Sequence, residues 1–290
     1  MRALVLLAAL LAATPLPAQE KINRRMAIAS DASIRIWNLA GITRIIGWDR
    51  DSIAVTGTVP SGAFYMGGSG TGAKLGVERP DGSKGDLPAT LEIRVPRNAR
   101  LWVKSASASI EVSGLTGEVE CSSVDGAVRV EGSLRLVVAE SMEGNLSVYG
   151  PMSVVRLKGG GGTITLRGAR GDLMATTVGG AILLTDAALR RAHLETVSGP
   201  VAYDGTVAAR GTLEVITHSG DVTLRLPTEI SAEFDLSSFD GAILYGLSGK
   251  GKGKGEPTPQ VGKPMSFTTG GGDARVTVRS FKGEIRVLKP

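Results

Sequence analysis

Residues 119–130, VECSSVDGAVRV, decide the fold, because their pattern returns at 137–148, VVAESMEGNLSV, and at 155–166, VRLKGGGGTITL. Each stretch has two alternating apolar positions, a short corner that ends in glycine, and two further alternating apolar positions. Alternation with a period of two is typical of a strand with one buried face. Recurrence at a fixed length indicates that each unit stacks on the last, as the coils of a solenoid do.

The corner residue recurs through the C-terminal two thirds of the chain, at Ala108, Gly126, Gly144, Gly162, Gly180, Gly199, Gly220, Gly241 and Gly283. The intervals are 18–21 residues, except for the last, whose 42 residues equal two of the longer periods. The flanking alternating positions, from Leu101 to Val287, are apolar at every corner. The sequence therefore predicts an all-β fold: a single-stranded parallel β-solenoid of about nine coils, stacked in chain order. Ile164, Ile182, Val201 and Val222 should form one inward column.

A small or hydroxylated residue stands three positions before each corner, as Ser123 and Thr196 do. Such hydroxyl groups bond nearby backbone amides in turns, and glycine tolerates the positive φ that a sharp corner can need. We interpret both as turn chemistry.

The first 18 residues have the pattern of a secretory signal peptide: Arg2, an apolar run over residues 3–13, and a small-residue exit at Ala18. The mature chain is therefore expected to be exported to the periplasm, the outer envelope or the extracellular space, with no transmembrane segment. Cys121 is the only cysteine, and its register places it in an inward column, where we expect an inert core thiol.

The net charge of +5 is too small to indicate a nucleic-acid partner. Part of the excess lies in a glycine- and lysine-rich loop at 247–266, which contains Lys250, Lys252 and Lys254. One interpretation is a weak contact of these lysines with an anionic surface, and the other is a solvated loop.

Residues 19–100 are less regular, and we interpret them as a β-rich cap on the solenoid domain at 101–290. Ile34, Ile36 and Ile45 fit one degenerate repeat around Gly41, and Trp37 and Trp48 are expected to anchor the packing. The glycine-rich run at 67–72 lacks the lysine of a phosphate-binding loop and is expected to be an ordinary loop.

Three segments carry a family resemblance: TVSGPV at 196–201, THSGDV at 217–222 and GGGDARVTVRSFKGEIRV at 270–287. Together with NLAG at 38–41 and GWD at 47–49, they resemble a family of exported bacterial proteins of unknown function described as candidate adhesins. The resemblance spans nearly all of the mature chain. It implies a β-solenoid of the bacterial envelope, and it implies no catalytic residues.

The sequence contains no residue pattern that favours a catalytic or metal-binding site. Asp125, Glu143, Asp221 and Asp240 stand next to corners and could align as in carbohydrate-active β-helices, but the intervening corners carry Gly161, Gly179 and Ser198. The only histidines, His193 and His218, have no partner at ligand spacing. We expect no catalytic residue, no cofactor and no metal site.

These observations predict a noncatalytic exported cell-envelope protein of adhesin type that uses its rod as an interaction or structural surface. Its partner would be an unidentified envelope component, either a protein or a polysaccharide. The alternative is a carbohydrate-binding or carbohydrate-active β-helix protein.

Overall fold

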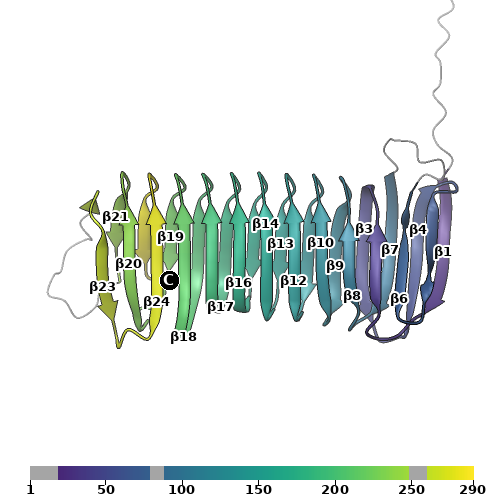
Figure 1. Ribbon diagram of the computed structural model, residues 1–290, viewed down its shortest axis with the longest axis horizontal. Helices are drawn as coiled ribbons and strands as arrows, with labels where there is room; N and C mark the ends of the chain where they lie inside the picture. Colours follow the sequence, from purple (N-terminus) through teal and green to yellow (C-terminus); the bar gives the residue numbers. More distant parts are fainter. Residues whose placement is uncertain (1–18, 79–87, 248–259) are drawn as a thin grey trace, which may run out of the picture.

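The computed structural model describes residues 19–78, 88–247 and 260–290, which form a rod of β-strands running across its long axis (Figure 1). The strands make two layers with the hydrophobic core between them. Layer A contains, in order along the rod, β5 (Phe64–Ser69), β6 (Gly72–Val77), β2 (Ser33–Trp37), β8 (Arg100–Lys104), β10 (Glu118–Ser123), β12 (Leu136–Ser141), β14 (Val154–Gly159), β16 (Arg170–Thr177), the second parts of β17 (Ile182–Thr196) and β18 (Val201–Thr217), β24 (Ala274–Ser280), β20 (Ala232–Ser238) and β23 (Met265–Thr269).

Layer B contains the strands that follow each corner. Their order is β1 (Gln19–Ala27), β4 (Ser52–Pro60), β7 (Pro88–Pro96), β3 (Ala40–Trp48), β9 (Ser109–Leu115), β11 (Val128–Gly132), β13 (Leu146–Tyr149), β15 (Ile164–Arg167), the first parts of β17 and β18, β19 (Val222–Arg225), β25 (Ile285–Leu288), β21 (Ala242–Tyr245) and β22 (Gln260–Val261). The all-β, solenoid-like architecture is confirmed. The described residues form no helix long and apolar enough to cross a bilayer, and the expected signal peptide at 1–18 lies outside them.

The predicted register is confirmed by the strand pairing. Ile164 pairs with Ile182, Ile182 with Val201, and Val201 with Val222, so these four side chains form one inward column. The expected inward positions between Leu101 and Val287 are buried, except that Tyr245 near the C-terminal end is half-buried. Burial of each aliphatic side chain contributes about 1.5–3 kcal/mol to the free energy of folding. The loss of chain entropy on folding offsets much of this gain.

Stacking in chain order is wrong at the C-terminal end. β24 pairs with β18 on one side and with β20 on the other, and β25 likewise lies between β19 and β21. The coil at 274–288 is therefore inserted between two coils that precede it in the sequence. Every parallel coil presents the same row of backbone N–H and C=O groups to its neighbours. A repeat pattern in the sequence therefore does not specify which coils lie next to each other.

The N-terminal region shows the same arrangement and corrects two further expectations. The degenerate repeat around Gly41 is a genuine coil, since Ile34 pairs with Leu101, and β2 lies between β6 and β8. The run at 67–72 is not an ordinary loop, because it supplies parts of β5 and β6, which pair as an antiparallel hairpin. Trp37 and Trp48 are only half-buried and lie outside the core.

Antiparallel strands terminate the parallel stack at both ends. β1 pairs with β4 and β5 with β6 at one end, while β23 pairs with β20 and β22 with β21 at the other. A solenoid needs such covers because an open parallel edge is a template for aggregation.

At the corners, the predicted hydroxyl chemistry is confirmed. The Ser123 hydroxyl accepts a hydrogen bond from the Gly126 amide at 2.9 Å, and the Thr217 hydroxyl accepts one from Gly220 at 2.9 Å. Positive φ is not the reason for glycine in the main series of corners, because none of the corner glycines from Gly126 to Gly283 has one, and only Gly41 of the degenerate repeat does, with φ of 99°. A Cβ at Gly199 would instead lie 1.9 Å from the carbonyl oxygen of Gly180 in the neighbouring coil. Close backbone stacking excludes a side chain there.

Candidate interaction surface

Large apolar side chains project from most of the turns along one edge of the rod, where the turns form a row in Figure 1, while Ala106, Gly160 and His218 stand at the equivalent position of the other turns. Each large apolar side chain stands two residues before a corner, and each is 40–67% exposed. We call this row the apolar ridge, and its members in spatial order are Leu39, Val124, Met142, Val178, Val197, Phe281 and Phe239.

The ridge is held in register by backbone hydrogen bonds between successive turns. The Val197 amide donates to the Val178 carbonyl at 3.1 Å, and the His218 amide donates to the Val197 carbonyl at 3.2 Å. His218 then stacks on Phe281, with ring centroids 5.0 Å apart, and Phe281 stacks on Phe239 at 5.1 Å. Ala106 and Gly160 interrupt the row, but exposed apolar side chains gathered along one edge mark an interaction site more often than a single exposed side chain does.

The acidic residues next to the corners are not gathered into one site. Asp125 and Glu143 lie on adjacent turns, whereas Asp221 and Asp240 lie on turns separated by the inserted coil of Gly283. The Asp221 carboxylate accepts a hydrogen bond from the Glu284 amide at 2.8 Å, which is a structural role. Lys250, Lys252 and Lys254 lie outside the described residues.

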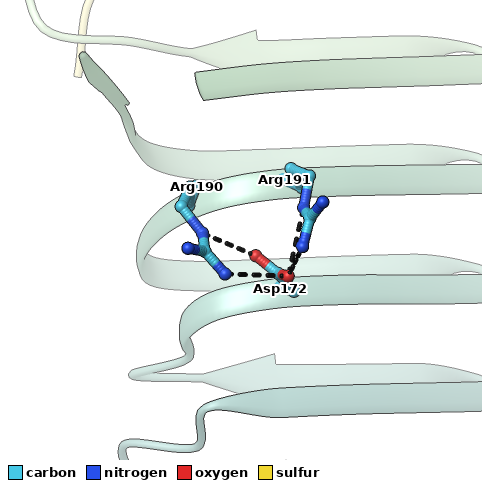
Figure 2. A network of polar contacts seen from close by, with 3 residues as sticks. All are labelled: Asp172, Arg190 and Arg191. Atoms are coloured by element: carbon cyan, nitrogen blue, oxygen red, sulfur yellow. Dashed lines mark hydrogen bonds and ion pairs between the residues drawn. The ribbon is translucent and has the colours of Figure 1, made fainter. Parts of the chain in front are cut away.

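A network centred on Asp172 joins β16 to β17 at the opposite edge of the rod (Figure 2). Its carboxylate accepts hydrogen bonds from Arg190 at 3.0 Å and from Arg191. The hydrogen bonds from Arg191 and then Arg190 lower the pKa of Asp172 to about 2. Both guanidinium groups are turned toward this carboxylate in Figure 2, so the network is a link between neighbouring coils rather than an open anion site.

The remaining reactive side chains offer no catalytic arrangement. His193 Nδ1 lies 3.0 Å from Glu214 Oε2, and its Nε2 lies 3.4 Å from Glu195 Oε2. No group of three or more potential metal ligands occurs within the part of the chain that the structure describes. Cys121 is buried between Val103 and Ala139, so its expected place in the core is confirmed, and burial raises the pKa of its thiol to about 12, which disfavours the reactive thiolate.

The rod and its exposed edge place the protein in the class of β-solenoid-like proteins without an evident catalytic centre in the described residues. The chain belongs to the Toastrack DUF4097 family, whose sequence model matches residues 49–288. The function of this family's domain is unknown. The family resemblance seen in the sequence is thus confirmed. Among curated proteins, none matches the sequence.

Three crystal structures share the fold at low sequence identity. A protein described as a candidate lipid-binding protein from Parabacteroides distasonis has a TM-score of 0.56 and 12% identity. Proteins described as candidate adhesins from Parabacteroides merdae and Parabacteroides distasonis have TM-scores of 0.53 and 0.54, with identities of 12% and 10%. Each alignment covers 93% of this chain and 97% of the other. These similarities show the fold.

Proposed function

We propose that this protein is a noncatalytic, exported protein of the bacterial cell envelope whose rod presents an interaction surface. The observation that carries the proposal is the apolar ridge. Polar residues at the turn tips would keep the rod soluble at a lower risk of aggregation, whereas this chain exposes Val, Met and Phe there. The description of related folds as candidate adhesins is consistent with this role.

The rigidity of the ridge supports binding. Hydrogen bonds between the turns fix the backbone, so a partner orders few main-chain torsions when it binds. The regular spacing of about 4.8 Å between stacked coils aligns these apolar side chains in one row, with gaps at Ala106 and Gly160. Such a row suits an envelope component with its own extended apolar surface.

The test is capture of the partner from envelope extracts by the purified mature protein. We expect the triple variant Met142→Ser, Val178→Ser, Val197→Ser to lose most of the captured component, because it removes the middle of the ridge. The matched control is Met174→Ser, Leu183→Ser, which removes exposed apolar side chains from the layer faces. All these side chains are exposed, so the Tm of each variant should stay close to that of the parent.

Equal capture by the ridge variant and the parent would show that the ridge is not the interaction surface. Turnover of a polysaccharide that is lost on substitution of Asp221 or Asp240 would exclude the noncatalytic role.

A further inference from the structure

The outer face of layer A at the N-terminal end combines cations with aromatic side chains and carries no acidic side chain on its strands. This face comprises the outward positions of β5, β6, β2 and β8, and we call it the basic face. Its basic residues are Lys74, Arg35, Arg100 and Lys104, and its aromatic residues are Tyr65, Trp37 and Trp102. The remaining outward positions are Gly67, Ser69, Gly72, Gly76 and Ser33.

The four cations have no carboxylate partner among the ion pairs of the described residues. Elsewhere on the layers, cations such as Arg44 and Arg275 are paired with a glutamate at 3.0 Å. The Arg35 guanidinium instead lies 5.9 Å from the ring centroid of Trp102, an arrangement that restricts its motion and leaves its charge uncompensated. The basic face therefore favours an anionic ligand.

A depression of about 610 Å³ lies within the basic face. Gly67 and Gly72 contribute no side chains to it, Tyr65 lies at one side, and Arg35 and Lys74 lie at another. Ser33 and Ser69 add hydroxyl groups to the lining. Burial, followed by the nearby Glu78 charge, raises the pKa of Tyr65, so its phenol is neutral at physiological pH and can act as a hydrogen-bond donor.

Part of the aromatic arrangement has a purely structural reason. Tyr65 and Trp37 both pair with Gly76, which is buried although it has no side chain. Aromatic rings that cover a strand glycine stabilise the sheet. This reason does not account for the open depression beside Gly67, nor for the two cations, Arg35 and Lys74, that line it.

We propose that the depression binds an acidic sugar unit of an envelope polysaccharide. The sugar ring would lie over Gly67 and Gly72 against the Tyr65 ring, its carboxylate would pair with Lys74 and Arg35, and its hydroxyls would bond Ser33 and Ser69. Lys104 extends the positive charge toward the next units of the chain, whereas Arg100 lies beside Glu118 of β10. The inference rests on the proposed interaction role, for which it names a polysaccharide partner at a site separate from the apolar ridge.

The geometry favours a sugar over two other anionic partners. A single-stranded nucleic acid needs a basic groove that follows several nucleotides, whereas this depression is confined to the β5, β6 and β2 strands. An anionic membrane favours aromatic side chains that protrude, whereas Tyr65, Trp37 and Trp102 are half-buried.

The test uses the full mature chain, a galacturonate tetramer as the probe, and isothermal titration calorimetry. We expect the parent to bind the tetramer, and a neutral galactose tetramer at least about tenfold more weakly. The double variant Arg35→Gln, Lys74→Gln should also weaken binding of the galacturonate tetramer at least about tenfold, because it removes both charge-assisted contacts.

The decisive variant is Gly67→Leu, which fills the depression and keeps all four cations. A Cβ at Gly67 meets no atom within 4 Å, so the Tm should change little while binding falls at least about tenfold. The matched control is Gly70→Leu, which is equally open but lies outside the depression and should bind as the parent does.

If Gly67→Leu bound the galacturonate tetramer as tightly as the parent does, binding would depend on positive charge alone and not on the depression, and the proposal would be overturned. Equal or tighter binding of a single-stranded oligonucleotide of the same charge, or of phosphatidylglycerol vesicles, would also overturn it. Capture through the apolar ridge in the absence of galacturonate binding would refute this inference alone. Intact galacturonate binding, together with capture of the envelope component that the ridge substitutions leave unchanged, would refute the proposed ridge function alone.

Discussion

Glycine has two separate roles in this chain, and they occur at opposite edges of the rod. At the corners that follow layer A, a carbonyl oxygen of the neighbouring coil occupies the space that a Cβ would need. At Gly180, for example, a Cβ would lie 2.0 Å from the carbonyl oxygen of Gly162. At the other edge, Gly132 and Gly168 have positive φ, and Asp186, with φ of 51°, takes the equivalent place one period later. Aspartate tolerates the left-handed region better than most residues, which accounts for its presence there.

Gly180→Ala should destabilise the protein by about 1–3 kcal/mol, because its methyl group would displace the stacked backbone of the neighbouring coil. The adjacent Gly179→Ala should have almost no effect, since the nearest atom to a Cβ there is the Ser198 hydroxyl at 3.9 Å. Urea denaturation followed by circular dichroism measures both. Equal stability of the two variants would mean that the corner backbones are not packed as closely as described.

At the scale of single elements, neighbouring coils are joined by side chains as well as by ladder hydrogen bonds. The clearest case is the Asp172 carboxylate on β16, which lies between Arg190 and Arg191 of β17 (Figure 2). Its carboxylate is only 19% exposed, although both arginines are more than 60% exposed. The link is therefore a partly exposed ion pair, and such pairs contribute about 1 kcal/mol or less to the free energy of unfolding.

The pH dependence of this link has a definite direction. The pKa of Asp172 is about 2 in the folded chain, below the value of about 3.9 expected for an unfolded aspartate. The stabilisation is therefore complete above about pH 5 and is lost progressively as the pH falls through about 4 to below 2.

Asp172→Asn should lower the unfolding free energy by about 1 kcal/mol at pH 7, and this difference from the parent should shrink steadily below about pH 4 and be small at pH 2. Thermal or urea denaturation at a series of pH values measures it. Asp204→Asn serves as the control, because Asp204 forms no ion pair among the described residues. A difference between parent and Asp172→Asn that persisted unchanged to pH 2 would contradict the role of the charge.

At the scale of the whole molecule, both ends of the rod have a spatial order that differs from the chain order. The coil of β2 and β3 lies between those of β6–β7 and β8–β9, and the coil of β24 and β25 lies between those of β18–β19 and β20–β21. As a result, the last described strands of the chain are interior strands with partners on both sides. The outermost strands, such as β23, come from earlier in the sequence.

Engineered cysteines can test this order directly. Thr223 and Arg286 are paired residues on the adjacent strands β19 and β25, so the double variant Thr223→Cys, Arg286→Cys should form a disulfide on oxidation. Thr223→Cys, Leu244→Cys should not, because β25 separates β19 from β21. The buried Cys121 does not interfere, and nonreducing gel mobility gives the result. Crosslinking of only the second pair would restore stacking in chain order.

The inward-facing residues and the composition of the turns could be read from the repeat pattern alone. Both are local consequences of a repeated alternation, so Ile182 and Ser123 could be placed without a structure. The neighbours of each coil, in contrast, became known only from the folded chain, because the exposed backbone groups of any parallel coil can pair with those of any other. This order of coils brings His218, Phe281 and Phe239 into one stack and places Tyr65, Arg35 and Arg100 on one face. The apolar ridge and the basic face depend on contacts between separate segments, which periodicity within a single coil does not encode.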